Sequence, residues 1–332
     1  MGLRVNLVID GNYLLYKSVF VLKKTRTIEE DLGNLIRRDY DRISKAFSYT
    51  NLFFVSDSGK SWRKELKSDY KGTRKKDDTI DWSMVYREYD KLKAELKTKP
   101  NCNVIEIEGM EGDDIVNYIV KTSNKEGFSN MIVANDGDLH QLLDFNLELG
   151  YINLMWNYKF NDERVYAPEN YFLFLEKVEH ENSSDDIFNL SDDLDFVKFV
   201  DDLINRTKLK EVNKEKSLFT KIIMGDTGDN IQGVVKIKDG KLNEEEGKGI
   251  GETGAEKCYD LYKEVNPELI DFKSDKFVDK ASEICMFYKK IKDIDVHNNI
   301  KDRIKLNIKL VHLDLGYLPP TLLENTKQKV KL

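Results

Sequence analysis

The stretch Met131-Ile132-Val133-Ala134-Asn135-Asp136-Gly137-Asp138 joins a short apolar run to two aspartates. An apolar run of this length, followed by turn-forming residues, is typical of a buried strand. Similar apolar runs occur at residues 5–9, 52–55 and 104–107. Amphipathic stretches lie between them, including residues 82–96 and 115–121. Because strand and helix patterns alternate, the sequence predicts an α/β fold with a mostly parallel central sheet flanked by helices.

The chain has 332 residues, 40% hydrophobic and 34% charged, which is typical of one large or two modest globular domains. Its net charge of −7 would argue against a nucleic-acid partner if the charge were evenly spread. The charges are segregated, however. Most of the charged residues in 60–76 are basic, and most of those in 176–202 are acidic. We infer a local basic face that the overall sum conceals.

The chain contains three cysteines, Cys102, Cys258 and Cys285, which form no CxxC pair. We therefore expect a reducing compartment, with neither a zinc site nor a disulfide framework. No stretch approaches the roughly 18 apolar residues of a membrane span. Residues 1–5 lead into a strand without the apolar region of a signal peptide. We expect a monomer without membrane contact in the cytoplasm, or in the host cytoplasm if the chain is phage-encoded.

Acidic residues follow each of the strand-like runs. Asp10, Asp57 and Asp136 follow three of them. The other acidic residues of interest are Glu111, Asp113 and Asp114 after the fourth run, Asp138, and the pair Asp226 and Asp229. Taken singly, each aspartate could be an ordinary turn residue or helix N-cap. Glu111 and Asp114 could likewise form an acidic first turn that the helix dipole favours.

Parallel strands bring their carboxyl ends to one edge of the sheet, so these carboxylates would meet there and repel one another. Divalent cations would relieve the repulsion. An all-oxygen ligand set suits Mg²⁺ or Mn²⁺, and a chain with only four histidines is a poor candidate for zinc. Two such ions, ~3.5–4 Å apart, can activate a water and stabilise the leaving oxygen of a phosphodiester. The pattern therefore indicates metal-dependent phosphodiester hydrolysis.

A basic stretch directly follows the expected ligand Asp57. Its Lys and Arg side chains could neutralise phosphates, and Trp62 or Tyr70 could stack on an unpaired base. The alternative is a solvated helix face with buried aromatic residues. The adjacent acidic edge favours a functional role, because phosphates attracted by these cations would lie beside the metal ions.

Residues 247–255 form a glycine-rich stretch, Gly-Lys-Gly-Ile-Gly-Glu-Thr-Gly-Ala. Glycines allow close backbone approach, and the N–H groups of a following helix can hold a phosphate. Alternatively, these glycines only make a turn. The stretch lacks the preceding strand of a Rossmann fingerprint and the GxxxxGK[ST] pattern of a Walker A loop.

Five motifs in order resemble the flap endonuclease/5′-nuclease superfamily, most of all the stand-alone bacteriophage 5′→3′ exonucleases that include phage ribonuclease H. The motifs are Val8-Ile9-Asp10-Gly11-Asn12, Tyr70-Lys71-Gly72-Thr73-Arg74, Gly109-Met110-Glu111-Gly112-Asp113-Asp114, Asn135-Asp136-Gly137-Asp138 and Met224-Gly225-Asp226-Thr227-Gly228-Asp229-Asn230-Ile231. The likeness extends from about residue 5 to residue 315. It implies a resolvase-like (PIN-like) core over residues 1–175, with a basic helical arch at about 60–100. It also implies a helical DNA-binding region over residues 216–332, with a helix–three-turn–helix element.

The resemblance also implies a site with two Mg²⁺ ions, for which Mn²⁺ can substitute. One ion would be held mainly by Asp10, Asp57, Glu111 and Asp113, and the other mainly by Asp136, Asp138 and Asp226, with Asp114 and Asp229 in supporting roles. Lys71 and Arg74 match a basic pair that contacts the scissile phosphate, so they join Asp10 and Asp136 as the expected catalytic residues. The further nucleic-acid contacts would be Lys17, Arg63, Lys64, Tyr70, Lys248, Gly249 and Gly251. In many relatives the glycine hairpin also holds a K⁺ ion.

Two stretches depart from the family pattern. Residues 235–246 are an insertion before the glycine hairpin. The acidic insertion, residues 176–215, contains an acidic segment around residues 178–202 that is longer than the resemblance predicts. It could shield the site, mimic DNA or bind a replication partner, but its composition favours a disordered surface loop.

We therefore expect a structure-specific 5′ nuclease that removes RNA primers and 5′ flaps in replication. Its partners would be branched or nicked DNA, RNA–DNA hybrids and replication proteins. One alternative is a non-catalytic DNA-binding protein of the same fold, which the apparently complete ligand set disfavours. The other is a single-strand-specific PIN-type ribonuclease, which the glycine hairpin disfavours because it grips duplexes.

Overall fold

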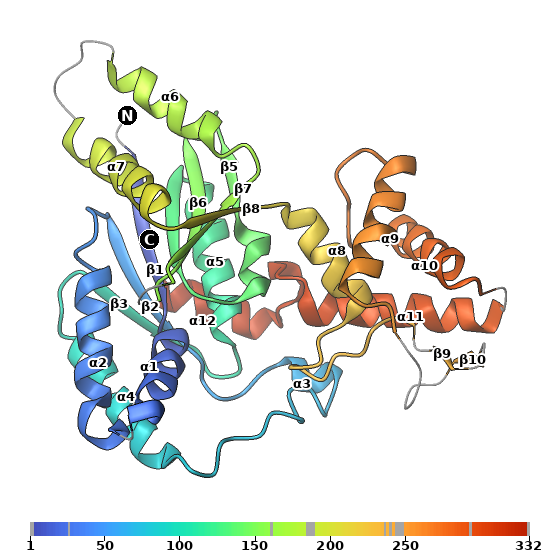
Figure 1. Ribbon diagram of the computed structural model, residues 1–332, viewed down its shortest axis with the longest axis horizontal. Coiled ribbons are helices and arrows are strands. Elements are labelled where there is room, and N and C mark those ends of the chain that lie inside the picture. Colours follow the sequence, from blue (N-terminus) through green and yellow to red (C-terminus); the bar gives the residue numbers. More distant parts are fainter. Residues whose placement is uncertain are drawn as a thin grey trace. The chain divides into compact units, whose positions relative to one another are not determined.

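The computed structural model describes residues 3–25, 27–159, 162–183, 190–235, 237–238, 241–242, 249–291 and 294–330. The chain folds into two compact units, shown as a ribbon in Figure 1. The first unit comprises Met1–Ser61, Asp77–Val212 and Leu318–Leu332. The second comprises Trp62–Lys76 and Asn213–Tyr317. The basic stretch, residues 62–76, thus belongs to the second unit, although the residues on either side of it belong to the first. The last helix belongs to the first unit, although the residues before it belong to the second.

The first unit is built on a mixed sheet with the strand order β3-β2-β1-β4-β6-β7-β8. Strands β3, β2, β1, β4 and β6 run parallel, β7 is antiparallel to β6, and β8 is parallel to β7. A short strand, β5, pairs antiparallel with β6. The strands are β1 (Arg4–Asp10), β2 (Asn51–Ser56), β3 (Cys102–Glu106), β4 (Phe128–Val133), β5 (Asp144–Asn146), β6 (Tyr151–Asn157), β7 (Arg164–Pro168) and β8 (Lys208–Val212).

Helices cover both faces of this sheet (Figure 1). On one face, α1 (Gly11–Thr25), α2 (Ile28–Ile43) and α4 (Trp82–Leu96) surround a core that includes Leu7 and Phe54. On the other face, α5 (Gly112–Asn124) packs on β1, β2 and β4. The predicted α/β fold with a mostly parallel sheet is therefore confirmed.

Helix α12 (Pro320–Lys329) packs within the first unit although it ends the chain. The Thr326 hydroxyl contacts the Met110 sulfur at 3.0 Å, and Lys329 Nζ donates to the Glu106 carbonyl at 2.8 Å. Glu106 ends β3, and Met110 lies in the connection from β3 to α5, which carries the Glu111 motif. This helix therefore supports the loop that presents the expected acidic residues.

The acidic segment forms two helices, α6 (Phe172–Ser183) and α7 (Leu190–Arg206), while residues 184–189 lie outside the described residues. Helix α7 places Phe196, Val197, Val200 and Leu203 in the core of the first unit. The expectation of a disordered surface loop is therefore wrong for residues 195–202. The acidic composition concealed apolar residues at helical spacing, and these anchor the helix.

The second unit is mainly helical. Its elements are α3 (Arg63–Leu66), α8 (Lys214–Met224), β9 (Ile237–Lys238), β10 (Lys241–Leu242), α9 (Glu252–Val265), α10 (Asp275–Lys289), α11 (Ile294–Val311) and the 3₁₀ helix η2 (Leu315–Tyr317). Phe219 lies at the centre of its core, with edge-to-face contacts to Tyr259 and Phe277. The insertion expected at residues 235–246 contains the short β9–β10 pair, and its other residues after 235 lie outside the described residues.

Among the described residues, no helix combines the length and apolar character that crossing a membrane would need.

Candidate metal centre

Three aspartates reach the same edge of the first unit because their strands are adjacent and parallel. Asp10 ends β1 and is paired in register with Val55, which precedes Asp57 by two residues. On the other side of β1, Ile9 pairs with Val133, three residues before Asp136. The structure therefore places Asp10, Asp57 and Asp136 at one edge, as the sequence predicted.

Asp10 is partly buried at this edge. Loss of hydration raises its pKa to about 7, and the negative charges of Asp57 and Asp136 contribute to the increase. Backbone hydrogen bonds from Tyr13 and Asn12 lower the pKa of Asp10 and partly offset this increase. The Tyr13 N–H donates to Asp10 Oδ1 at 3.0 Å. The carboxylates therefore repel one another at the sheet edge, which is the condition that a bound cation would relieve.

Asp57 is held by two groups from different elements. Its Oδ2 accepts from Asn12 Nδ2 at 2.9 Å, and its Oδ1 accepts from the Gly112 N–H at 2.5 Å. The Asn12 side-chain oxygen in turn accepts from the Asp57 N–H at 3.2 Å. Asn12 thus orients Asp57, a role that the sequence analysis missed. Its place in the Asp10-Gly11-Asn12 motif was the available signal.

Glu111 and Asp114 cap α5. Glu111 is the N-cap residue, and the two side chains form a capping box in which Asp114 Oδ2 accepts from the Glu111 N–H at 3.4 Å. Both residues are buried. The alternative of an acidic first turn therefore describes the local geometry of this pair. Asp113 lies in the same turn, and its carboxylate joins those of Asp136 and Asp138.

Asp113, Asp136 and Asp138 form a group that could hold a metal ion. Their carboxylate oxygens lie within 4.8 Å of one another, and all three residues are partly buried. Asp136 is also the N-cap of the 3₁₀ helix η1 (Gly137–Leu142), where its Oδ1 accepts from the Asp138 N–H at 2.8 Å. An all-oxygen donor set beside a carboxyl group of raised pKa fits a hard divalent cation such as Mg²⁺ or Mn²⁺.

In the second unit, Asp226 begins a tight loop after α8. The Asp226 and Ile231 backbones exchange hydrogen bonds of 2.8 and 2.7 Å, which close the loop. Gly225 has φ 75°, and a Cβ there would lie 2.5 Å from the Ile231 carbonyl oxygen, so only glycine fits. Burial alone would raise the pKa of Asp226, but Lys221 Nζ at 2.8 Å and the Gly228 and Asp229 N–H groups lower it.

The same loop holds the basic pair. Asp229 accepts a hydrogen bond from the buried Tyr70 hydroxyl at 3.0 Å, forms an ion pair with Arg74, and lies 3.8 Å from Lys71 Nζ. The Lys71 backbone is in the left-handed region, with φ 58°, and its N–H donates to the Asp229 carbonyl at 2.9 Å. Strained backbone of this kind persists where surrounding contacts fix it, often at functional sites.

The comparison that decides the family concerns residues 5–171, which match the family described as "5′-3′ exonuclease, N-terminal resolvase-like domain". The chain belongs to the 5′-3′ exonuclease family. It is 26% identical over 294 residues to a 5′-3′ exonuclease of Mycoplasmopsis pulmonis, a match that covers 86% of this chain and 78% of that protein. It is also 32% identical over 104 residues to ribonuclease H of Enterobacteria phage T4, covering 30% of this chain and 34% of that protein.

Solved structures agree with the family fold. The chain superposes on the bacteriophage T5 5′-exonuclease with bound zinc ions at a TM-score of 0.59 and 19% identity, covering 98% of both chains. A bacteriophage T5 flap endonuclease in a product-like complex with DNA and metal ions gives a TM-score of 0.55 and 17% identity, again over 98% of both chains. This member of the 5′-3′ exonuclease family is therefore a nuclease with the expected resolvase-like fold.

Three residues expected to contact nucleic acid have other roles in this 5′-3′ exonuclease family member. Tyr70 is only 3% exposed and lies in the core of the second unit, which favours a structural role over base stacking. Arg63 is also 3% exposed, and its Nε donates to the Leu310 carbonyl at 2.8 Å. Lys17 forms a largely buried ion pair of 2.7 Å with Asp39. Their expected contacts with nucleic acid stay predictions, and the sequence could not show their burial because charge and aromatic content do not reveal it.

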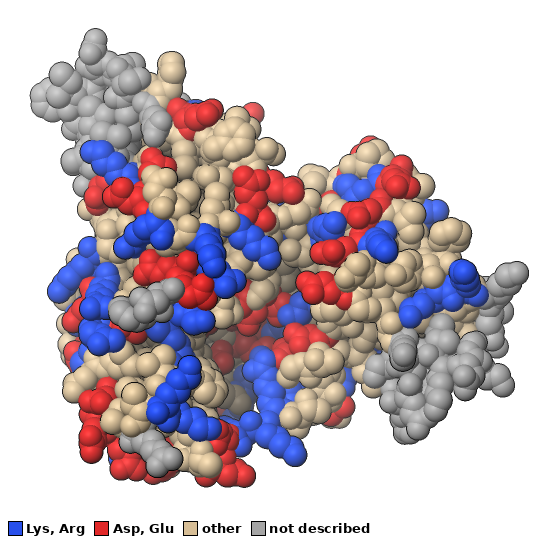
Figure 2. Space-filling view, viewed as in Figure 1, with Lys and Arg blue, Asp and Glu red and all other residues tan. Residues whose placement is uncertain are grey.

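The remaining expected contacts are compatible with a role in binding. Lys64 is exposed, and Figure 2 shows Lys and Arg side chains gathered along the stretch after α3. Gly251 is the N-cap of α9, and the Gly249 carbonyl accepts from Lys289 Nζ at 2.9 Å. Lys248 lies outside the described residues. The roles of Lys64, Gly249 and Gly251 stay predictions.

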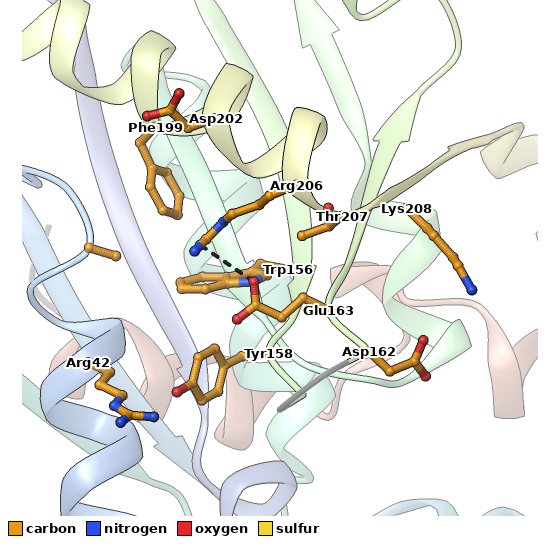
Figure 3. A pocket seen from close by; sticks show the side chains of 11 residues that line it. Arg42, Trp156, Tyr158, Asp162, Glu163, Phe199, Asp202, Arg206, Thr207 and Lys208 are labelled. Atoms are coloured by element: carbon orange, nitrogen blue, oxygen red, sulfur yellow. Dashed lines mark ion pairs between the residues drawn. The ribbon is translucent and has the colours of Figure 1, made fainter.

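A hollow of about 1070 Å³ lies on the first unit between α2, the end of β6 and α7 (Figure 3). Trp156, Tyr158 and Phe199 line it, together with an ion pair of 3.4 Å between Arg206 and Glu163. None of the expected metal ligands is among the lining residues of this hollow. The candidate metal centre is therefore distinct from this hollow.

Proposed function

We propose that this nuclease hydrolyses phosphodiesters near the 5′ ends of branched or nicked DNA and of RNA–DNA hybrids. The observation that carries the proposal is the group formed by Asp113, Asp136 and Asp138 beside Asp10 at the carboxyl edge of the sheet. We further propose Mg²⁺ as the ion, with Mn²⁺ as a substitute, because all the donors are carboxylate oxygens.

The chain's own residues would divide the work. Asp10, Asp113, Asp136 and Asp138 would hold the divalent cations and balance their charge. Asn12 and the Gly112 N–H would keep Asp57 oriented toward the same edge. The bound ions would supply an activated water and stabilise the leaving oxygen. No side chain then needs to act as a general base.

The second unit would supply cations for the phosphate. Asp229 holds Lys71 and Arg74 together, so the two positive groups are already positioned before substrate arrives. Such preorganised charge stabilises a developing oxyanion without reorganisation during the reaction. The expected roles of Glu111 and Asp226 as main ligands, and of Asp114 and Asp229 as supporting ligands, stay predictions. So does a K⁺ ion at the glycine hairpin, residues 247–255.

The substrate class is supported by the relatives. The bacteriophage T5 structure is a flap endonuclease with DNA, and the bacteriophage T4 relative is a ribonuclease H. Together they suggest action on flaps and on RNA–DNA hybrids, and hence a role in removing primers during replication. Replication proteins would be the corresponding partners.

The test uses the purified chain with 5′-labelled flap, nicked duplex, RNA–DNA hybrid and single-stranded substrates, with Mg²⁺, Mn²⁺ or EDTA. We expect cleavage that requires a divalent cation and a duplex next to the 5′ end. Absence of products with either cation on every substrate would refute the proposal. Preferential cleavage of single-stranded RNA would indicate a PIN-type ribonuclease, and metal-independent binding without products would indicate a DNA-binding protein.

A further inference from the structure

A chain of hydrogen bonds connects the two ends of the carboxylate edge in the first unit. The Tyr13 N–H donates to Asp10 Oδ1 at 3.0 Å, and the Tyr13 hydroxyl lies 2.8 Å from Asn157 Oδ1. Asn157 Nδ2 donates to Asn135 Oδ1 at 2.6 Å. Asn135 directly precedes Asp136. The path therefore links Asp10 to the residue next to Asp136 through Tyr13, Asn157 and Asn135, none of which is an expected metal ligand.

Asn157 is the central member of this path. It ends β6, next to β4 in the sheet, and is only 6% exposed. Its amide uses both ends, with the oxygen toward Tyr13 and the nitrogen toward Asn135. A buried amide with both groups satisfied has a defined orientation, since rotating it would leave buried polar atoms unpaired.

Tyr13 is suited to remain a donor in this path. The hydroxyl also lies 2.7 Å from the Tyr158 carbonyl, so its single proton is shared between that oxygen and Asn157 Oδ1, and both contacts hold it against the end of β6. The same residue therefore contacts Asp10 through its backbone and Asn157 through its side chain.

We propose that Asn157 is a positioning residue for the metal centre. Its amide joins Tyr13 to Asn135 and so fixes the position of Asp136 relative to Asp10. This inference rests on the proposed metal-dependent function. Groups that orient metal ligands are worth about 10–100-fold in metal affinity or activity when removed. Within the described part of the chain, the side-chain hydrogen bonds of Asn157 go to Tyr13 and Asn135 and not to a ligand carboxylate, so its effect would pass through these two residues.

The test compares Asn157→Ala, Tyr13→Phe and the double variant with the wild-type chain. Tyr13→Phe removes only the hydroxyl and keeps the N–H bond to Asp10. Asn6→Ala is the matched control, because Asn6 is a fully buried amide on β1 that bonds Asn51 and Asn130 at the opposite end of the strand. Three quantities are measured: the Kd for Mn²⁺ without nucleic acid, the Tm in EDTA, and the Mn²⁺ concentration for half-maximal cleavage.

We expect Asn157→Ala to raise the Kd for Mn²⁺ by about tenfold and to shift the cleavage curve equally. Tyr13→Phe should produce part of this shift, and the double variant should add little to Asn157→Ala, because both changes break one path. Asn6→Ala should lower the Tm without changing the Kd.

An unchanged Kd in Asn157→Ala, with a lowered Tm, would make Asn157 merely structural and overturn the inference. If Asn157→Ala does not fold, an unchanged Kd in Tyr13→Phe has the same consequence. A wild-type chain that neither binds Mn²⁺ nor cleaves would instead refute the proposed function, so the two failures are distinguishable.

Discussion

The Lys71 ammonium lies 3.8 Å from Asp229 Oδ2, and Arg74 contacts the other oxygen of the same carboxylate. The Asp229 side chain is only 8% exposed, whereas the Arg74 side chain is 56% exposed, so the carboxylate is shielded from solvent and the guanidinium is not. The basic stretch and the Asp226–Ile231 loop therefore form one folded element of the second unit, although about 150 residues of sequence separate them. Two cations thus share one anion, and we propose that they contact a phosphate of the substrate.

Replacing Lys71 should therefore slow the chemical step. We expect Lys71→Met to lower the single-turnover cleavage rate by ~10²–10³-fold, the scale for losing one preorganised charge-stabilising group. Lys75→Met, which removes an exposed lysine from the same stretch, controls for the change in net charge. Equal rates for the two variants would remove Lys71 from the catalytic residues.

Asp136→Ala should abolish turnover but retain binding of flap DNA. The substitution removes one member of the carboxylate group and reduces negative charge where a phosphate must approach, so affinity should be unchanged or higher. The measurements are cleavage with Mg²⁺ and the Kd for labelled flap DNA. Asp144→Ala, on β5, is the control and should cleave normally. Residual turnover near the wild-type rate would exclude Asp136 as a required ligand.

Tyr70→Phe separates a buried structural role from base stacking. The change removes the hydrogen bond to Asp229 and keeps the ring, so we expect a loss of ~1.5–3 kcal/mol in the free energy of unfolding. DNA affinity should change little when it is measured well below the melting temperature. The comparison is Tyr259→Phe, which removes a hydroxyl bonded to Glu215 in the same unit. If both Tyr70→Ala and Tyr70→Phe folded normally and only Tyr70→Ala weakened DNA binding, the result would indicate that the Tyr70 ring stacks on a base.

The metal-free protein should become less stable as pH rises. The pKa of Asp10 is about 7 in the folded chain, above its usual value of 3.8, so protonation favours the folded state. This contribution is complete below pH ~4 and is lost as pH rises through about 7. In EDTA, Asp10→Asn should be more stable than the wild type at pH 8 and nearly equal to it at pH 4.

Mn²⁺ should reverse this dependence in the wild type, raising the Tm more at pH 8 than at pH 5.5, because the cation binds the ionised carboxylate. Thermal unfolding of both proteins across this range is the measurement. Parallel Tm curves for the wild type and Asp10→Asn in EDTA would contradict the role given to Asp10.

The sheet and its acidic edge could be predicted because both depend on local patterns. Each of the runs before Asp10, Asp57 and Asp136 is apolar and short, and parallel strands necessarily bring their carboxyl ends together. An acidic first helical turn at Glu111 and Asp114 was also considered as an alternative, since a spacing of three residues suits a first turn; the capping box itself was not predicted.

Burial of polar side chains could not be predicted in the same way. Arg63 donates to a carbonyl 247 residues away, and no local pattern indicates such a partner. Lys17 on α1 forms an ion pair with Asp39 on α2, and nothing in the sequence around Lys17 indicates this partner. The apolar face of α7 was hidden because the acidic residues between its core positions dominate the composition.

The interleaving of the two units has a practical consequence for dissecting the gene. A fragment that stops at residue 212 would lack the α12 side chains that bond Met110 and the Glu106 carbonyl, and its residues 62–76 would lose their partners in the second unit. A fragment that starts at residue 213 would leave Asp229 without Tyr70, Lys71 and Arg74. No single cut between 62 and 317 yields an intact half, so loss of nuclease activity in a truncated product says little about which residues perform the chemistry.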